Sequence, residues 1–182
     1  MGRNAKNISK SSLRRFDLLM IFVMLGTQNN SFYRLLEEID KLLEKNVIQE
    51  DVIVQAGYTQ YEPKNEKMKI LNFMPREELD KLEQEASYII THGGVGSIIT
   101  SLEKRKKVIA VPRLHEYNEH VNNHQKEIIE KFNKNKNIIG IQSVKELEGA
   151  IKRIKNFEPK PYEENNQKLL KIIEDFIDNI KS

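Results

Sequence analysis

Two clusters of glycine and polar residues carry the residue types that could do chemistry in this chain. The first is THGGVGS at 91–97, which follows an apolar run and holds three of the eight glycines. Such a turn, placed between a strand and a helix, can bind an anion, because the first N–H groups of a helix lack partners and the helix dipole favours negative charge. The spacing fits neither GxGxxG nor GxxxxGK[ST]. A purely steric role in a tight turn is the alternative.

The second cluster, PRLHEYNEHVNNHQ at 112–125, contains three of the four histidines. Its Asn, Gln, Glu and His side chains supply the donors and acceptors that recognise hydroxyl groups. His120 and His124 stand four residues apart, so on one helix face they could share a zinc ion. The chain has no HExxH motif, and we predict no metal. A solvated polar helix start is the plainer alternative.

Composition limits the class of protein. The chain has 182 residues, 38% of them apolar and 31% charged, which suits one domain with a hydrophobic core. It has no cysteine, so disulfides, thiolate nucleophiles and cysteine-bound metals are excluded. The longest apolar run, Leu18–Leu25, is too short to span a bilayer.

The net charge of +3 comes from the N-terminal residues. Residues 1–19 hold five basic residues and one acidic residue, and the remainder holds 25 basic and 26 acidic residues. A nearly neutral body argues against nucleic-acid binding. We interpret 1–19 as a basic, disordered extension or as the product of a start codon upstream of Met20. A signal-peptide n-region and a membrane-surface arm are the alternatives.

Apolar, β-rich runs alternate with amphipathic stretches along the rest of the chain. The expected strands are 20–25, 51–57, 69–74, 87–91, 107–112 and 137–141. The expected helices are 31–46 capped by Ser31, 76–86 after Pro75, 97–106, a segment from about Glu119, 143–156 with a Ser143/Glu146 capping box, and 163–180.

This alternation predicts an α/β fold, a Rossmann-like doubly wound and mostly parallel sheet. The domain is expected over 20–160, with the amphipathic helix in 161–182 packed against it. Ligands of such sheets bind at the carboxyl ends of the strands. Both clusters fall at that edge, together with GTQ at 26–28 and QAG at 55–57.

Taken together, ITHGGVGSI at 90–98 and VPRLHEYNEHVNNHQ at 111–125 resemble the family 28 glycosyltransferase C-terminal domain. MIFVMLGTQNNSFYRLLEEID at 20–40 and VIVQAGYTQY at 52–61 carry the same resemblance, which covers roughly 20–160. The small single-domain members are the most similar. They are the catalytic subunit of bacterial two-subunit exopolysaccharide β-1,4-galactosyltransferases and the cytosolic subunit of the UDP-N-acetylglucosamine transferase of dolichol-linked oligosaccharide synthesis.

The resemblance implies the donor-binding half of a GT-B glycosyltransferase. The residues implied to bind the diphosphate and nucleotide are Gly26, Thr27, Gly93, Gly94, Gly96, Ser97 and Thr100. Those implied to contact the donor sugar are Arg113, Tyr117, Glu119, Asn123, His124 and Gln125. The catalytic candidates are His92, Glu119 and His120. The general base stays open between His92, His120, His124 and a residue of a partner.

One position departs from the family pattern. Many relatives carry a glutamate eight residues after the histidine, where its carboxylate can bind both ribose hydroxyls. This chain has Thr100 there, and its nearest acid in the sequence is Glu103. A threonine hydroxyl is expected to make a weaker, single contact.

The resemblance also implies an inverting, metal-free transfer that needs no cofactor beyond the UDP-sugar co-substrate. The expected partner is a membrane-anchored subunit that binds a lipid-linked sugar acceptor, so the chain is expected in the cytoplasm, recruited to the membrane. A non-catalytic nucleotide-binding accessory subunit is the main alternative. A plain flavodoxin-like binding domain is a third, but it leaves the second cluster unexplained.

Overall fold

The fold is a six-stranded parallel sheet between two layers of helices. A computed structural model describes residues 19–162. The strand order is β3-β2-β1-β4-β5-β6, and every neighbouring pair is parallel. The sequence prediction of a Rossmann-like, doubly wound α/β fold is therefore confirmed. The strands are β1 Met20–Met24, β2 Asp51–Gln55, β3 Met68–Leu71, β4 Tyr88–His92, β5 Val108–Val111 and β6 Ile139–Gly140.

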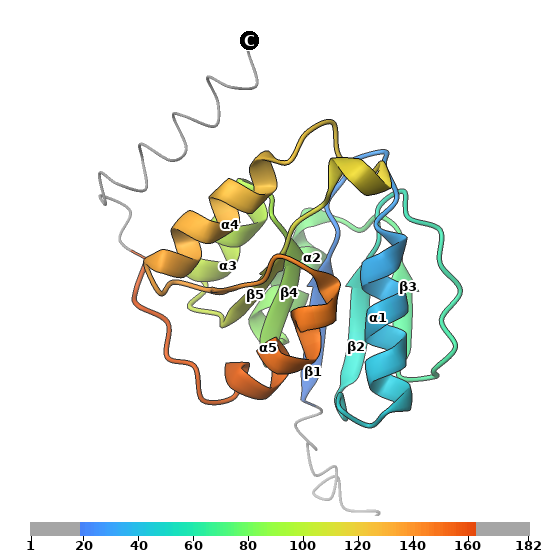
Figure 1. The fold of residues 1–182 in the computed structure, drawn as a ribbon. Coiled ribbons are helices and arrows are strands. Elements are labelled where there is room, and N and C mark those ends of the chain that lie inside the picture. Colours follow the sequence, from blue (N-terminus) through green and yellow to red (C-terminus); the bar gives the residue numbers. More distant parts are fainter. Residues whose placement is uncertain (1–18, 163–182) are drawn as a thin grey trace, which may run out of the picture.

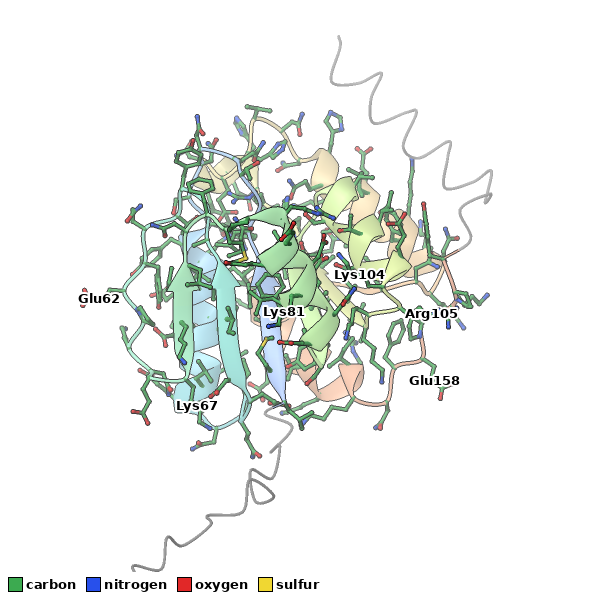
Figure 2. All side chains as sticks on the ribbon, turned by 180° about the vertical axis from the view of Figure 1, so that it is seen from behind. Glu62, Lys67, Lys81, Lys104, Arg105 and Glu158 are labelled. Carbon is green, nitrogen blue, oxygen red and sulfur yellow. The ribbon has the colours of Figure 1, made fainter. Side chains whose placement is uncertain are left out.

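The helices lie on both faces of the sheet. They are α1 Tyr33–Glu44, α2 Arg76–Glu85, α3 Val95–Glu103, α4 His124–Lys134 and α5 Leu147–Ile154, with short 3-10 turns η1 His115–Tyr117 and η2 Val144–Glu146. Figure 1 shows α1 and α5 on the near face, and Figure 2 shows α2 and α3 over the far face. Within residues 19–162, no helix has the length and apolar character needed to cross a membrane.

Side chains of β1 alternate between the two hydrophobic cores, as expected for a strand buried on both faces. Ile21 and Val23 pack in the core under α1 and α5. Met20, Phe22 and Met24 pack under α2. A third cluster joins α3 and α4 to β5. The apolar run at the start of the domain therefore forms the centre of the sheet.

Helix starts were predicted with mixed success. The capping box of Ser143 and Glu146 is confirmed, and it initiates η2 and α5. The prediction that Ser31 caps the first helix is wrong. Phe32 occupies the N-cap position without a side-chain cap, and its N–H donates to Thr59 Oγ1 at 3.0 Å. Pro75 is the N-cap of α2 rather than part of its first turn.

The fourth helix begins later than the sequence predicts. It starts at His124 instead of about Glu119, because the preceding chain forms η1 and then a left-handed residue, Asn118. His120 therefore precedes the helix, and the pairing of His120 with His124 on one helix face is wrong. The predicted extension 1–19 lies, apart from Leu19, outside the described residues, and so does the predicted helix 163–180.

Candidate functional site

A cavity of about 390 Å³ opens at the carboxyl ends of β1 and β4, where the strand order reverses. Ligands of doubly wound sheets bind at this switch point. Most residues of the first cluster line the cavity, together with residues from the β1 end and from the segment before α2. The predicted site residues in its lining are Gly26, Thr27, His92, Gly94, Gly96, Ser97 and Thr100.

Two glycine turns leave room for the ring of His92. Gly26 has φ +76°, and a Cβ atom there would lie 2.7 Å from His92 Cε1. A Cβ atom on Gly94 would overlap His92 Nε2. Gln55 holds the first turn, since its side chain accepts from Gly26 N at 3.2 Å and donates to Gly26 O at 3.1 Å. Gly26 is therefore favoured by its positive φ and by close packing, and a side chain at either glycine would displace the His92 ring.

The start of α3 offers backbone donors to the cavity. Gly94 is its N-cap, no side chain caps it, and the first helical bond runs from Ile98 N to Gly94 O. The N–H groups of Val95, Gly96 and Ser97 thus have no partner within the helix. A Cβ atom on Gly96 would meet nothing within 4 Å. Open space beside unpartnered N–H groups suits an anion such as a diphosphate.

His92 is neutral in this environment. Burial, and secondly the positive charge of Arg113, lower the pKa of His92 from 6.5 to about 4. Nδ1 lies 3.3 Å from Met24 O, and a carbonyl only accepts, so this contact assigns the proton to Nδ1. Nε2 then carries a lone pair and lies between Gly26 and Gly94 at the cavity wall. His92 is therefore a hydrogen-bond acceptor at neutral pH.

Gln125 joins the two sequence clusters. Its Oε1 accepts from Gly93 N at 3.1 Å and from Arg113 N at 3.0 Å, so one side chain holds the glycine loop against the segment after β5. Arg113 is fully buried and donates to the carbonyls of Leu25, Asn30 and Glu119. Desolvation lowers the pKa of Arg113 to about 10. In this structure both residues hold loops together, and their predicted contact with a donor sugar stays a prediction.

Glu119 also has a structural partner. Its carboxylate binds Arg34 of α1 through two hydrogen bonds, of 2.7 and 2.8 Å, and accepts from Leu114 N at 2.9 Å. Tyr117, which is exposed, stacks on the Arg34 guanidinium at 4.8 Å. Glu119 as a catalytic or sugar-binding group stays a prediction, and its carboxylate is almost fully buried.

The remaining residues of the second cluster lie beside these anchors. Asn123 accepts from His115 N at 2.9 Å. His120 Nδ1 accepts from Asn122 N at 3.3 Å, and burial lowers the pKa of His120. His124 is partly exposed at the start of α4. Over residues 19–162, no group of three or more His, Asp or Glu side chains is placed to hold a metal ion.

Sequence reasoning missed one wall of the cavity. That wall comes from the segment between β3 and α2 and from α2 itself, and it consists of Phe73, Met74, Arg76, Leu79 and Glu83. Thr100 contacts Glu83 in space, so Glu103, the nearest acid in the sequence, is not its acidic neighbour. The signal that could have found this wall is the helix start after Pro75, which the predicted sheet places at the same edge.

A larger hollow of about 750 Å³ lies elsewhere, between the end of α3 and residues 159–162. It contains none of the predicted site residues. It also adjoins Tyr162, where the described part of the chain ends. The smaller cavity is the candidate site, because it holds the backbone donors, the histidine and the topological switch point.

The sequence pattern of the glycosyltransferase family 28 C-terminal domain matches residues 20–180. The chain belongs to this family. The sequence-based identification of the family is thereby confirmed, and the domain supports a transferase. No curated protein sequence matches the chain significantly.

Solved glycosyltransferases share the fold. The glycosyltransferase of kitacinnamycin aligns with 96% of this chain at 14% identity and a TM-score of 0.56, over 42% of its own length. MurG of Acinetobacter baumannii aligns with 76% at 17% identity and a TM-score of 0.54, over 41% of its length. The ALG13 solution structure aligns with 90% at 17% identity and a TM-score of 0.54, over 96% of its length. This chain thus spans about two fifths of two of these proteins and matches nearly all of the third.

Proposed function

We propose that the chain is the donor-binding catalytic subunit of a two-subunit glycosyltransferase. It moves a hexose or an N-acetylhexosamine from a UDP-sugar to a lipid-linked sugar acceptor. The observation that carries the proposal is the cavity at the β1/β4 switch point, where the first turn of α3 directs backbone N–H groups into open space beside Gly96. The family match supports the transfer of a sugar from an activated donor.

The start of α3 stabilises the leaving group in this mechanism. As the bond between the sugar and the diphosphate breaks, negative charge grows on the diphosphate. The N–H groups of Val95, Gly96 and Ser97 and the dipole of α3 lie where they stabilise that charge without rearrangement. Gly94 permits this approach, and its lack of a side chain leaves His92 beside the same space.

The acceptor hydroxyl must lose a proton to a base on the opposite face of the sugar. With a pKa of about 4, His92 is a weak base at neutral pH in the empty site. A bound diphosphate next to Nε2 would raise that pKa and let His92 carry a proton to the leaving oxygen. We therefore propose that His92 contacts the diphosphate. The general base is then either His120 or a residue of the partner subunit.

The likeness to a small family member supports a partner. The chain aligns with ALG13 over 96% of that protein's length, and with 42% of the kitacinnamycin enzyme and 41% of MurG. In this proposal a membrane-anchored subunit binds the acceptor, and the chain joins it from the cytoplasm.

The test measures binding and transfer separately. Saturation-transfer NMR on the full chain would compare UDP, UDP-galactose, UDP-glucose, UDP-N-acetylglucosamine, GDP and NAD. Gly94→Asp is the site variant, because its side chain would overlap His92, and Gly149→Asp is the charge-matched control in open space on α5. We expect uridine nucleotides alone to bind, and Gly94→Asp alone to abolish the signal.

Transfer is then measured with membranes of the source cell and a labelled UDP-sugar. We expect label in extracted lipid only when chain and membranes are mixed. Binding without transfer in that mixture would favour the non-catalytic accessory subunit. Binding of GDP or NAD in preference to UDP would contradict the proposed donor.

A further inference from the structure

Exposed aromatic and large apolar side chains gather at the carboxyl edge of the sheet. Within residues 19–162, all of them except Leu19 lie at or after the carboxyl ends of β1, β2, β3 and β5. They are Tyr33, Tyr58, Leu71, Phe73, Tyr117 and Val121. Apolar groups that gather on one side of a protein mark a place where a ligand or a partner binds. The edge that carries the candidate site is therefore the place to look for a second ligand.

The ring of Tyr117 belongs to a series of cation–π contacts. The guanidinium group of Arg34 lies over the Tyr117 ring at 4.8 Å and over the buried Phe32 ring at 5.2 Å. The guanidinium group of Arg113 lies over the same Phe32 ring at 4.9 Å. We call these four residues the Arg–aromatic ladder. Figure 1 shows the turn η1, which carries Tyr117, in yellow beside the start of α1.

Arg34 gives the Tyr117 ring a fixed support. Its guanidinium group binds both oxygens of Glu119, at 2.7 and 2.8 Å, and donates to Pro112 O at 2.7 Å. A ring that is already held in place loses little conformational entropy when a ligand binds to it. Tyr117 is 58% exposed, so the face of the ring that does not meet Arg34 is open to solvent.

The other end of the ladder reaches the candidate cavity. Arg113 donates to Leu25 O at 2.7 Å, and the next residue, Gly26, lines the cavity. Tyr117 itself is not among the lining residues. The ladder thus fixes the position of Tyr117 relative to the cavity while keeping it outside. A group bound on Tyr117 would lie at the edge where the donor site opens, and it would be held in a defined orientation toward the donor.

The surroundings of Tyr117 favour a neutral ligand that has both C–H and hydroxyl groups. A second cation on the ring is disfavoured, because the positive charge of Arg34 lies behind it. The neighbours His115, Glu116 and Asn118 are exposed and offer hydrogen-bond donors and acceptors. A pyranose ring matches this arrangement, since its C–H face can pack on the aromatic ring while its hydroxyls reach the polar groups around it.

We propose that Tyr117 is a stacking platform for a sugar ring of the acceptor. This inference rests on the proposed function, and it adds a contact that this chain itself makes with the acceptor. The partner subunit then binds the acceptor from the other side, and Tyr117 helps to align it with the donor. The inference also separates Tyr117 from the residues that the sequence predicts at the donor sugar.

The experiment is fluorine NMR of the full chain labelled with 3-fluorotyrosine. The chain has six tyrosines, and Tyr117→Phe identifies the signal of Tyr117. The donor site is first saturated with a UDP-sugar, and the methyl β-glycosides of glucose, galactose and N-acetylglucosamine are then titrated. We expect at least one glycoside to shift the Tyr117 signal in a saturable manner. Sorbitol, which has hydroxyls but no ring, should leave the signal unchanged.

Variants test the contribution of the aromatic face. In saturation-transfer NMR we expect Tyr117→Ala to weaken glycoside binding about tenfold, and Tyr117→Phe to bind as the wild type does, because it keeps the ring. The matched control is Tyr33→Ala, which removes an aromatic side chain that is 51% exposed at the same edge and should not change glycoside binding. Thermal unfolding of each variant reports on folding.

The inference is wrong if no glycoside shifts the Tyr117 signal. A shift by the UDP-sugar alone would then assign Tyr117 to the donor sugar. A shift by solubilised membranes of the source cell alone would assign it to a protein contact. In each of these cases UDP binding to the wild type leaves the proposed function standing. If UDP does not bind the wild type, the proposed function fails and the inference fails with it.

Discussion

Arg34 and Glu119 form a two-armed ion pair that fastens the start of α1 to the loop after β5. The side chains are 16% and 4% exposed. Arg34 also donates to Pro112 O at 2.7 Å. Two segments far apart in the sequence thus meet through one guanidinium group, beside the edge where the candidate site lies.

Removing one partner of this pair should destabilise the domain. We expect Glu119→Ala to lower the free energy of unfolding by about 3 kcal/mol, because it leaves a largely buried guanidinium group without its carboxylate. Chemical denaturation measures the change. The matched control is Glu148→Ala on α5, whose partner Lys152 is 65% exposed, so that the loss of this pair should change stability far less. Equal effects of the two substitutions would show that the buried pair contributes nothing special.

A substitution at Gly96 should change folding stability and ligand affinity in opposite directions, because open space lies beside this residue. A Cβ atom there meets no protein atom within 4 Å, so Gly96→Ala should raise stability by about 0.5–1 kcal/mol, as glycine replacements in helices do. The same methyl group occupies space proposed for the diphosphate, so we expect UDP affinity to fall at least about tenfold. Gly149→Ala, also in a helix and in open space, should give the stability gain with no change in affinity. Normal UDP affinity of Gly96→Ala would place the ligand elsewhere.

His92 should make folding sensitive to mild acid. Its pKa falls to about 4 in the folded chain, from an ordinary value near 6.5 in the unfolded chain. The unfolded state therefore binds the proton first as the pH falls. The stability linked to neutral His92 is present above pH 6.5 and is lost between pH 6.5 and 4, by about 1.4 kcal/mol per pH unit.

Denaturation at pH 7 and pH 5 tests this linkage. We expect His92→Asn to lose about 2 kcal/mol less than the wild type between these two values. The pKa of the partly buried His120 is also lowered, so His120 changes stability in the same direction and some pH dependence should remain in the variant. An unchanged pH dependence in His92→Asn would mean that His92 is not the group that titrates.

Replacing Gln125 should lower the free energy of unfolding more than replacing an exposed polar residue would. Its oxygen satisfies two buried N–H groups, those of Gly93 and Arg113. Gln125→Leu leaves both without a partner, and we expect a loss of about 2–4 kcal/mol, since each unsatisfied buried group costs about 1–3 kcal/mol. Hydrogen exchange of the two amides should speed up in the variant. Protected amides in a folded Gln125→Leu chain would contradict the anchoring role.

The sheet was predictable from the sequence because the hydrophobic pattern of each strand and helix is visible within a short segment. Each buried strand is an apolar run bounded by polar or glycine residues, and the helices between them show regular spacing, as in YRLLEEIDKLLE of α1. The edge at which the candidate site lies followed from the parallel order of the strands. The glycine loop was predictable for the same reason, since it comes directly after β4.

The roles of single side chains were not predictable, because they depend on contacts between distant segments. Arg113, Glu119 and Gln125 have the residue types of a sugar site, yet their polar atoms are bound to other segments of the chain, up to 88 residues away. A glutamate in a helix is usually exposed to solvent, yet Glu83 is buried and contacts Thr100. Only the packing of α2 on α3 shows the difference.

The central place of β1 has a consequence for how the chain is made. β1 pairs with β2 on one side and with β4 on the other. During synthesis β2 follows β1 soon, but β4 is complete only when His92 has been added. At about 5–20 residues per second, the other edge of the most apolar strand stays unpaired for seconds on the ribosome. An exposed apolar edge invites pairing with other chains, so the nascent protein should depend on chaperones during that interval.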